Sequence, residues 1–208
     1  MDFPLVEYLT ILGIFSIGAI SPGPDFAMVL RQSIIHGRKA AIFTSLGIAS
    51  AILIHGTYTI LGLGLIITKS AILFQGVKYI GAAYLLWLGI NALLAPAPKP
   101  AKNLTKYNQK INISKSFSIG FLTNLLNPKA MLFFISLFTL VVSVDTEVKF
   151  QAFYVLSMSI VLFLWFFSVS LFFTTKKVSN GFYKLGKWFN SITGLVLIFL
   201  AIKMVFFQ

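Results

Sequence analysis

The chain has 208 residues, of which 58% are hydrophobic and only 11% are charged. Soluble domains are about one-quarter charged and roughly 45–50% apolar, so this composition excludes an ordinary soluble domain. The formal net charge is +12 and the chain has no cysteine, which excludes thiolate metal binding and thiol-based electron transfer.

The hydrophobic residues are gathered in six long runs. Spanning a bilayer takes about 20 apolar residues, and backbone amides in lipid must be satisfied within their own segment, which favours helices. The sequence therefore predicts an all-α integral membrane protein with six transmembrane helices. The runs cover residues 5–35, 40–67, 72–95, 115–143, 150–175 and 185–207.

The first run is interrupted by two prolines beside a carboxylate, in the segment Ser21-Pro22-Gly23-Pro24-Asp25. Proline removes a helix hydrogen bond and clashes with the preceding turn, so two prolines flanking a glycine predict an open break, which we place near the middle of the membrane. A simple kink or a capping carboxylate near the interface is the structural alternative. A charge at the bilayer centre costs about 2.5–3.5 kcal/mol, which favours a functional role for Asp25.

The second run contains His55, which lies on one predicted helix face with Gly47 and Ala51. A histidine here is compatible with a proton relay or with a hydrogen-bonded packing role, and the sequence leaves both interpretations open. Four glycines of the second and third runs are interpreted as points of close helix contact. They are Gly47, Gly62, Gly64 and Gly89.

A segment rich in proline and lysine follows the third run. Residues 96–115 begin with Pro96-Ala97-Pro98-Lys99-Pro100, a composition that disfavours packed structure. We interpret this segment as a flexible cytoplasmic linker between two halves of the chain, residues 1–95 and 116–208.

The fourth run holds the second unexplained charge, in the segment Asn127-Pro128-Lys129. At 1.5 Å per residue, Lys129 is roughly 20 Å from Ser116 and roughly 24 Å from Asp145, near the centre of its span. A second broken helix is therefore predicted at Pro128. Discontinuous helices with exposed N-termini near the midplane are typical of substrate sites in secondary transporters.

The two halves repeat this organisation. Each half begins with its broken helix and contains three runs, so the second half must be inverted across the membrane relative to the first. The sequence thus predicts a 3+3 inverted repeat with helices one and four broken near mid-membrane.

The basic residues indicate an orientation. The connections after the first, third and fifth runs hold three, five and four lysines or arginines, whereas the opposite side holds four in all. Short cytoplasmic loops carry such an excess, so both termini are predicted outside. Basic loops beside anionic lipid also account for the net charge, and we prefer this interpretation to nucleic-acid binding.

The motifs resemble those of the lysine-exporter and threonine/homoserine-exporter (LysE/RhtB-type) family. Ser-Pro-Gly-Pro-Asp-Phe at 21–26, followed by Arg31, resembles its first-helix signature, and residues 120–124 with 127–130 resemble its fourth-helix signature. The resemblance extends over the whole chain. It implies a six-helix carrier in the bacterial cytoplasmic (inner) membrane, with amino-acid efflux driven by the proton gradient and no cofactor.

The charged breaks suggest how an amino acid would bind. The substrate carboxylate would meet a broken-helix N-terminus and Lys129, its ammonium would face Asp25, and a proton would compete with it for that carboxylate. Further polar contacts are predicted from Ser21, Asn124 and Asn127.

Other classes of protein are weighed against this one. A divalent-metal or other small-metabolite exporter of the same superfamily remains an alternative, although one deep carboxylate is a poor metal-ligand set. An enzyme is not predicted, because the chain has no H-E-x-x-H, no G-x-S-x-G and no paired carboxylates. A structural membrane subunit would not need opposed charges at two breaks. Faces of small residues are also compatible with a homodimer.

Overall fold

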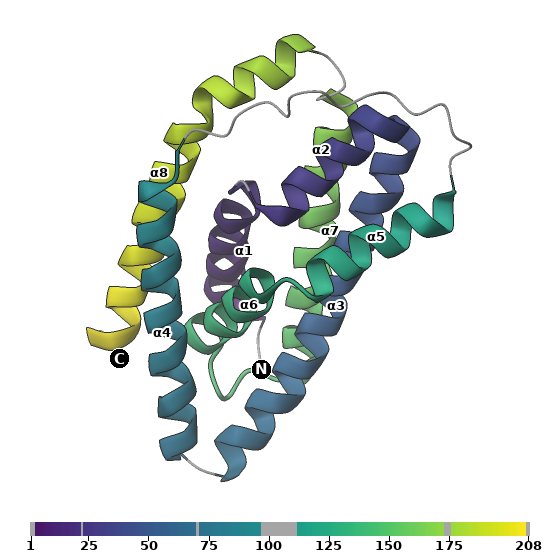
Figure 1. Cartoon of the computed structure of the whole chain (residues 1–208). Helices are drawn as coiled ribbons and strands as arrows, with labels where there is room; N and C mark the ends of the chain where they lie inside the picture. The colour runs from purple at the N-terminus through teal and green to yellow at the C-terminus, as the bar shows by residue number, and fades with distance from the viewer. Residues whose placement is uncertain (1–2, 22, 70, 97–111, 173–175, 207–208) are drawn as a thin grey trace.

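The computed structural model describes residues 3–21, 23–69, 71–96, 112–172 and 176–206. These residues form eight helices and, within those ranges, no strand (Figure 1). The helices are α1 (Leu5–Ile20), α2 (Pro24–His36), α3 (Arg38–Lys69), α4 (Ala71–Leu94), α5 (Ile113–Leu125), α6 (Pro128–Val141), α7 (Val148–Phe172) and α8 (Lys176–Phe206).

The two runs that were predicted to be broken each form two helices. α1 and α2 meet at an angle of 55°, and α5 and α6 meet at 58°. Each second helix begins at a proline, where the missing N–H costs nothing because the first turn has no intrahelical acceptor for it. The prediction of helix breaks at Pro24 and Pro128 is therefore confirmed.

The candidate spans among the described residues are all helical. Three segments are long and apolar enough to cross a membrane, namely Arg38–Gly62, Gln75–Leu94 and Val148–Phe172, and there are up to five if each bent pair is one span. The sixth run corresponds to α8, in which the shorter segment Asn190–Lys203 is apolar. The six-span 3+3 inverted repeat remains a prediction.

Some predicted features lie outside the described residues. Pro22, residues 97–111 of the linker and the surroundings of Gly64 are among them. α5 begins at Ile113, so the last three residues of the predicted linker 96–115 are helical.

The described helices pack around two separate hydrophobic cores. The larger core unites buried side chains from α1, α2, α3, α6 and α7, and the smaller one joins α4 to α8. In Figure 1 the α4–α8 pair stands apart from α2 and α5. It contacts α6, where the Ser136 hydroxyl lies 3.3 Å from the carbonyl of Gly81 and the Tyr84 hydroxyl lies 3.4 Å from the carbonyl of Pro128.

Glycines allow the closest helix contacts. A Cβ placed on Gly47 of α3 would lie 2.7 Å from the backbone nitrogen of Phe121 of α5, and a Cβ on Gly89 of α4 would lie 2.8 Å from the carbonyl of Gly194 of α8. The prediction of close contact is confirmed at these two positions. It is wrong at Gly62, where a Cβ would meet no atom of the described residues within 4 Å.

The end of the molecule that carries the N-terminus is tied together by Glu7 of α1. Its carboxylate accepts hydrogen bonds from the Ser143 backbone N–H (2.9 Å) and from the Thr146 hydroxyl (3.0 Å), in the turn between α6 and α7. Aromatic rings from the N-terminal segment, α1 and α7 pack against one another at this end, and they belong to Phe3, Tyr8, Phe150, Phe153 and Tyr154.

Gly47→Ala is expected to destabilise the fold, because the added methyl group must push the α5 backbone away. Overpacking of this kind costs about 1–3 kcal/mol. Gly62→Ala on the same helix is the matched control, because its methyl group enters open space. Thermal unfolding of the purified protein in detergent would show a lower midpoint for Gly47→Ala only. Equal midpoints for the two variants would contradict the tight α3–α5 contact.

Candidate functional site

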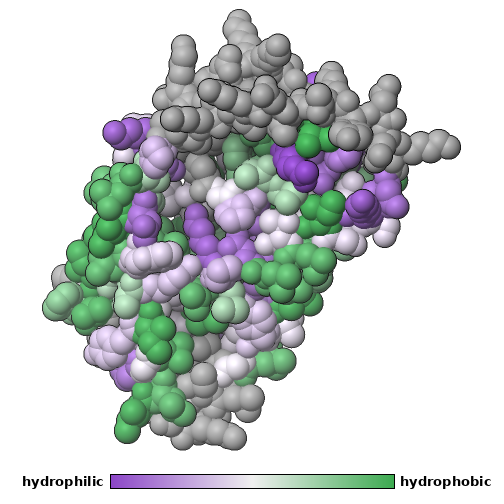
Figure 2. All heavy atoms as spheres, viewed as in Figure 1, coloured by the Kyte–Doolittle hydropathy of each residue, from purple (hydrophilic) through white to green (hydrophobic). Residues whose placement is uncertain are grey.

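The two breaks face one pocket in the interior of the molecule. About 70 Å³ of it is open to a water-sized sphere, which is room for several waters by that measure. Figure 2 shows hydrophilic side chains gathered in a hollow near the middle of the visible face, with hydrophobic side chains on both sides. Among the residues that line the pocket, the polar ones belong mainly to the two breaks, and much of the remaining wall is aromatic: Phe15, Phe26, Phe133, Phe134 and Phe166.

The first break places a carboxylate at the start of a helix. α1 ends at Ile20, and Ser21 donates its N–H to the Gly18 carbonyl (3.2 Å). Gly23 is the extended N-cap of α2, so Asp25 is the second residue of that helix. A negative charge at this end is stabilised by the helix dipole.

The second break has the same construction with the opposite charge. Asn127 is the N-cap of α6, and its side-chain oxygen accepts the Lys129 backbone N–H at 3.0 Å. Pro128 is the first residue of the helix and Lys129 the second. A positive charge at a helix N-terminus is opposed by the dipole, so this end of the pocket favours an anion.

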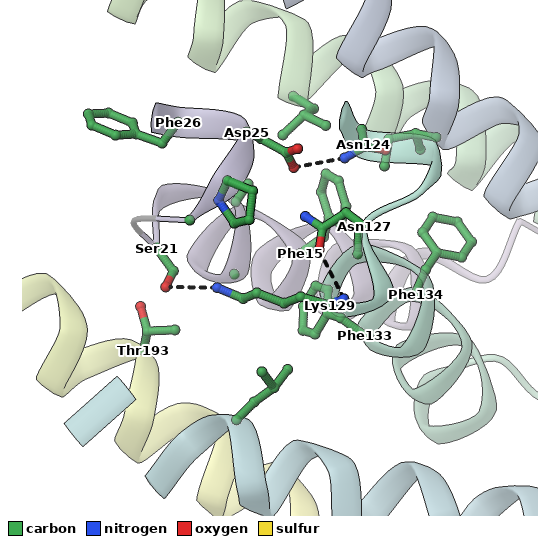
Figure 3. A pocket seen from close by; sticks show the side chains of 18 of the residues that line it. Phe15, Ser21, Asp25, Phe26, Asn124, Asn127, Lys129, Phe133, Phe134 and Thr193 are labelled. Carbon is green, nitrogen blue, oxygen red and sulfur yellow. Dashed lines mark hydrogen bonds between the residues drawn. The ribbon is translucent and has the colours of Figure 1, made fainter. Parts of the chain in front are cut away.

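Hydrogen bonds connect each charge to the other break (Figure 3). The Asn124 side-chain amide donates to Asp25 Oδ2 at 2.8 Å, and the Lys129 ammonium donates to the Ser21 hydroxyl at 3.4 Å. Among the described residues, Asp25 and Lys129 make no ion-pair contact within 4 Å. The pocket thus holds two opposite charges that polar neighbours keep from a direct pairing.

Two oxygens of this network accept no hydrogen bond. Asp25 Oδ1 and Asn124 Oδ1 are both buried without a partner. Buried polar atoms are nearly always paired, because leaving one unpaired costs about 1–3 kcal/mol. Two unpartnered acceptors beside one pocket are suited to a ligand with several N–H donors, such as an ammonium group.

A single residue, Asn124, connects His55 to the Asp25 carboxylate. The His55 side chain is fully buried, with Nδ1 at 2.5 Å from the Tyr58 hydroxyl and Nε2 at 3.3 Å from the Asn124 backbone carbonyl. The histidine therefore contacts the backbone of the second break at Asn124, the residue whose side chain donates to Asp25.

The structure thus brings most of the sequence-predicted residues together. Ser21, Gly23, Pro24, Asp25, Asn124, Asn127 and Lys129 line the pocket. Pro128 begins the adjoining helix, and His55 supports the second break from α3.

Two residues escaped the sequence analysis. Thr193 of α8 is buried and lines the same pocket, although no charge or proline marks it in the sequence (Figure 3). Tyr58 lies three residues after His55, a spacing at which helix side chains meet, and this was the available signal. Within the part of the chain that the structure describes, no group of three or more His, Cys, Asp or Glu side chains could hold a metal ion.

The fold and the pocket define a multi-pass membrane protein whose two broken helices surround an internal charged site. The chain belongs to the LysE type translocator family, which it matches over residues 16–207. This is a family of membrane transporters, in agreement with the resemblance seen in the two break motifs.

Individual relatives are similar over nearly their full length. The chain is 32% identical to the threonine efflux protein of Escherichia coli K12 (91% of this chain and 93% of that protein). It is 31% identical to the leucine efflux protein of Klebsiella pneumoniae (100% and 98%) and 32% identical to an uncharacterized membrane protein of Bacillus subtilis (96% and 97%). No solved structure matches the chain.

Asn127→Ala is expected to impair both the α6 N-cap and the site. Loss of an Asn cap costs about 0.5–2 kcal/mol. Asn112→Ala is the matched control, because Asn112 caps α5 in the same way, accepting the Lys115 N–H at 2.9 Å, and is exposed and outside the pocket. Thermal unfolding should show a loss in both variants, whereas a transport assay should show a loss in Asn127→Ala alone. Equal transport by the two variants would argue against a role for this cap in the site.

Proposed function

We propose that this protein exports a neutral amino acid from a bacterial cell in exchange for protons. The observation that carries the proposal is the pair of opposite charges, Asp25 and Lys129, that line one buried pocket without pairing with each other. A zwitterion brings one ammonium and one carboxylate and would satisfy both ends of such a site.

The ammonium end is supported by the unpartnered oxygens. Asp25 Oδ1 and Asn124 Oδ1 would accept two of the three ammonium N–H groups, and Asp25 would supply the compensating charge. A single available carboxylate matches the α-ammonium and leaves none for the side chain of a lysine or arginine, which is why we propose a neutral substrate.

The carboxylate end is formed by α6. The Lys129 ammonium and the positive end of the helix dipole would both attract the substrate carboxylate. The Ser21 hydroxyl, which now accepts from Lys129 at 3.4 Å, would then be free to donate to the same anion. The bound carboxylate would thus offset the repulsion between the Lys129 ammonium and the positive end of the α6 dipole.

The side chain of the substrate would lie against the aromatic wall. Phe15, Phe133, Phe134 and Phe166 offer apolar surface in the pocket wall. Burial of apolar area contributes about 25 cal/mol per Å², so small aliphatic side chains would gain affinity there. The names of the threonine and leucine efflux relatives support this substrate class.

Proton coupling follows from competition at one atom. A proton on Asp25 would occupy the carboxylate that otherwise holds the substrate ammonium, so the two cannot bind together. Inside the cell, the deprotonated carboxylate binds the ammonium. Outside, an incoming proton takes its place and returns with the empty carrier. The proton gradient is the energy source, and no cofactor is required.

The finer features of the predicted fold belong to this proposal. We place the protein in the bacterial cytoplasmic membrane with both termini outside, as the basic loops indicate. The two halves, 1–95 and 116–208, would be inverted repeats, which the matching cap–proline–charge construction of α2 and α6 supports.

Asp25→Asn and Lys129→Met are expected to abolish or weaken export. Both replacements keep the approximate shape and remove the charge. Proteoliposomes loaded with radiolabelled leucine or threonine would be given an inward proton gradient. Asp25→Asn should release no more substrate than protein-free liposomes, and Lys129→Met should raise the KM by about ten- to a hundredfold, the cost of a charged hydrogen bond.

Glu147→Gln supplies the control for that experiment. Glu147, which precedes α7, pairs at 2.8 Å with Lys149 at the start of that helix, and this contact lowers the pKa of the Glu147 carboxyl. Its replacement removes a carboxylate without touching the pocket, so transport should be unchanged. Proton-driven efflux by Asp25→Asn at the wild-type rate would refute the coupling role of this residue.

A further inference from the structure

His55 has both ring nitrogens engaged although it is fully buried among transmembrane helices. Nδ1 meets the Tyr58 hydroxyl on the same helix, and Nε2 meets the backbone carbonyl of Asn124 at 3.3 Å on α5. The ring of Phe134 covers it at a centroid distance of 6.3 Å. These three contacts hold the ring in this position.

The partners determine the tautomer of a neutral ring. A carbonyl oxygen can only accept, so Nε2 must carry the hydrogen that is shared with Asn124. Nδ1 then has a lone pair and accepts the hydrogen of the Tyr58 hydroxyl. Tyr58 thereby selects the tautomer that can donate to the second break.

The carbonyl that His55 contacts is at the end of a helix in an apolar environment. Such carbonyls lack the next turn of helix as donors. The Asn124 carbonyl receives the Asn127 N–H at 3.0 Å, and His55 supplies a further donor from α3. The peptide of Asn124 is therefore held from two sides.

The same residue orients the carboxylate of the site. Asn124 donates its side-chain amide to Asp25 Oδ2 at 2.8 Å. We infer that His55, oriented by Tyr58, is a positioning residue that fixes the backbone of Asn124 and thereby the amide that aims Asp25 at the substrate ammonium. This inference rests on the proposed function of the pocket for its effect on transport.

A positioning role differs from the proton relay that the sequence left open. The ring is connected to Asp25 only through Asn124, whose backbone carbonyl meets the ring and whose side-chain amide donates to the carboxylate. Amides neither gain nor lose protons near neutral pH. The structure contains no hydrogen bond between His55 and Asp25, both of which are described. The proton that Asp25 exchanges would reach it through the pocket and not through the ring.

Four variants test the inference in the proteoliposome assay. His55→Gln keeps an N–H donor for the Asn124 carbonyl and has no titratable group, so KM within about twofold of wild type and an unchanged pH profile are expected. His55→Leu removes the donor and should raise KM by about three- to tenfold, with a smaller change in kcat. Tyr58→Phe should raise KM by about two- to threefold. Ser159→Ala, which removes a buried hydrogen bond of 2.7 Å to the Ala49 carbonyl outside the pocket, should leave KM and the pH profile unchanged.

Loss of proton dependence in His55→Gln would overturn the inference in favour of a relay. Wild-type KM in His55→Leu would overturn it as well. A wild-type protein that moves neither leucine nor threonine would instead refute the proposed function, and it would be recognised before the variants are compared.

A spectroscopic readout is independent of transport. The chain has two histidines, so His36→Gln leaves His55 as the one source of ¹⁵N-histidine ring signals in lipid bilayers. The nitrogen shifts of a neutral ring protonated at Nε2 are expected, and Tyr58→Phe should move the Nδ1 shift. A ring protonated at Nδ1, or at both nitrogens, would contradict the positioning role.

Discussion

A helix that is interrupted inside an apolar environment must find partners for its ends, and this requirement shapes the centre of the molecule. Two of the helical runs are interrupted, at Pro24 and Pro128, and the partners that satisfy their ends are residues in the pocket or next to it. Asn127 caps α6, the Ser21 N–H folds back on α1, and His55 reaches the end of α5 from α3. The polar groups that keep the breaks stable are also the ones that make a site for a polar ligand.

The charges at the starts of α2 and α6 give the site a negative end and a positive end. Asp25 and Lys129 occupy the same second position of their helices, where the dipole favours the carboxylate and opposes the ammonium. The α2 start therefore stabilises the charge that it carries, whereas the α6 start opposes its own charge and favours an anion. The tight α3–α5 contact at Gly47 holds the second break against α3, and the α4–α8 contact at Gly89 joins the two helices of the smaller core.

The sequence predicted the breaks and their charges because proline and an ionisable residue in an apolar run each carry a large local cost. It also predicted the helical runs, whose length is set by the bilayer. It did not predict Thr193 or the role of Tyr58. An uncharged polar residue in a helix has a small free-energy cost, and which side chains it contacts depends on how the helices pack. Gly62 was misjudged for the same reason: glycine marks a close contact only when another helix lies opposite. Within the described part of α8, the apolar segment is Asn190–Lys203, which is shorter than the predicted run 185–207.

The separation of Asp25 from Lys129 has a consequence for the membrane potential of the cell. Had the two side chains formed an ion pair, their charges would compensate each other, and the carrier could reorient with neither substrate nor proton bound. Each such cycle would let ions slip across the membrane without moving metabolite. On the proposed mechanism, the charges are held apart by Asn124 and Ser21, so the vacant carrier is too polar to reorient until a proton or a substrate fills it. The membrane potential would then be preserved when the cell has little to export.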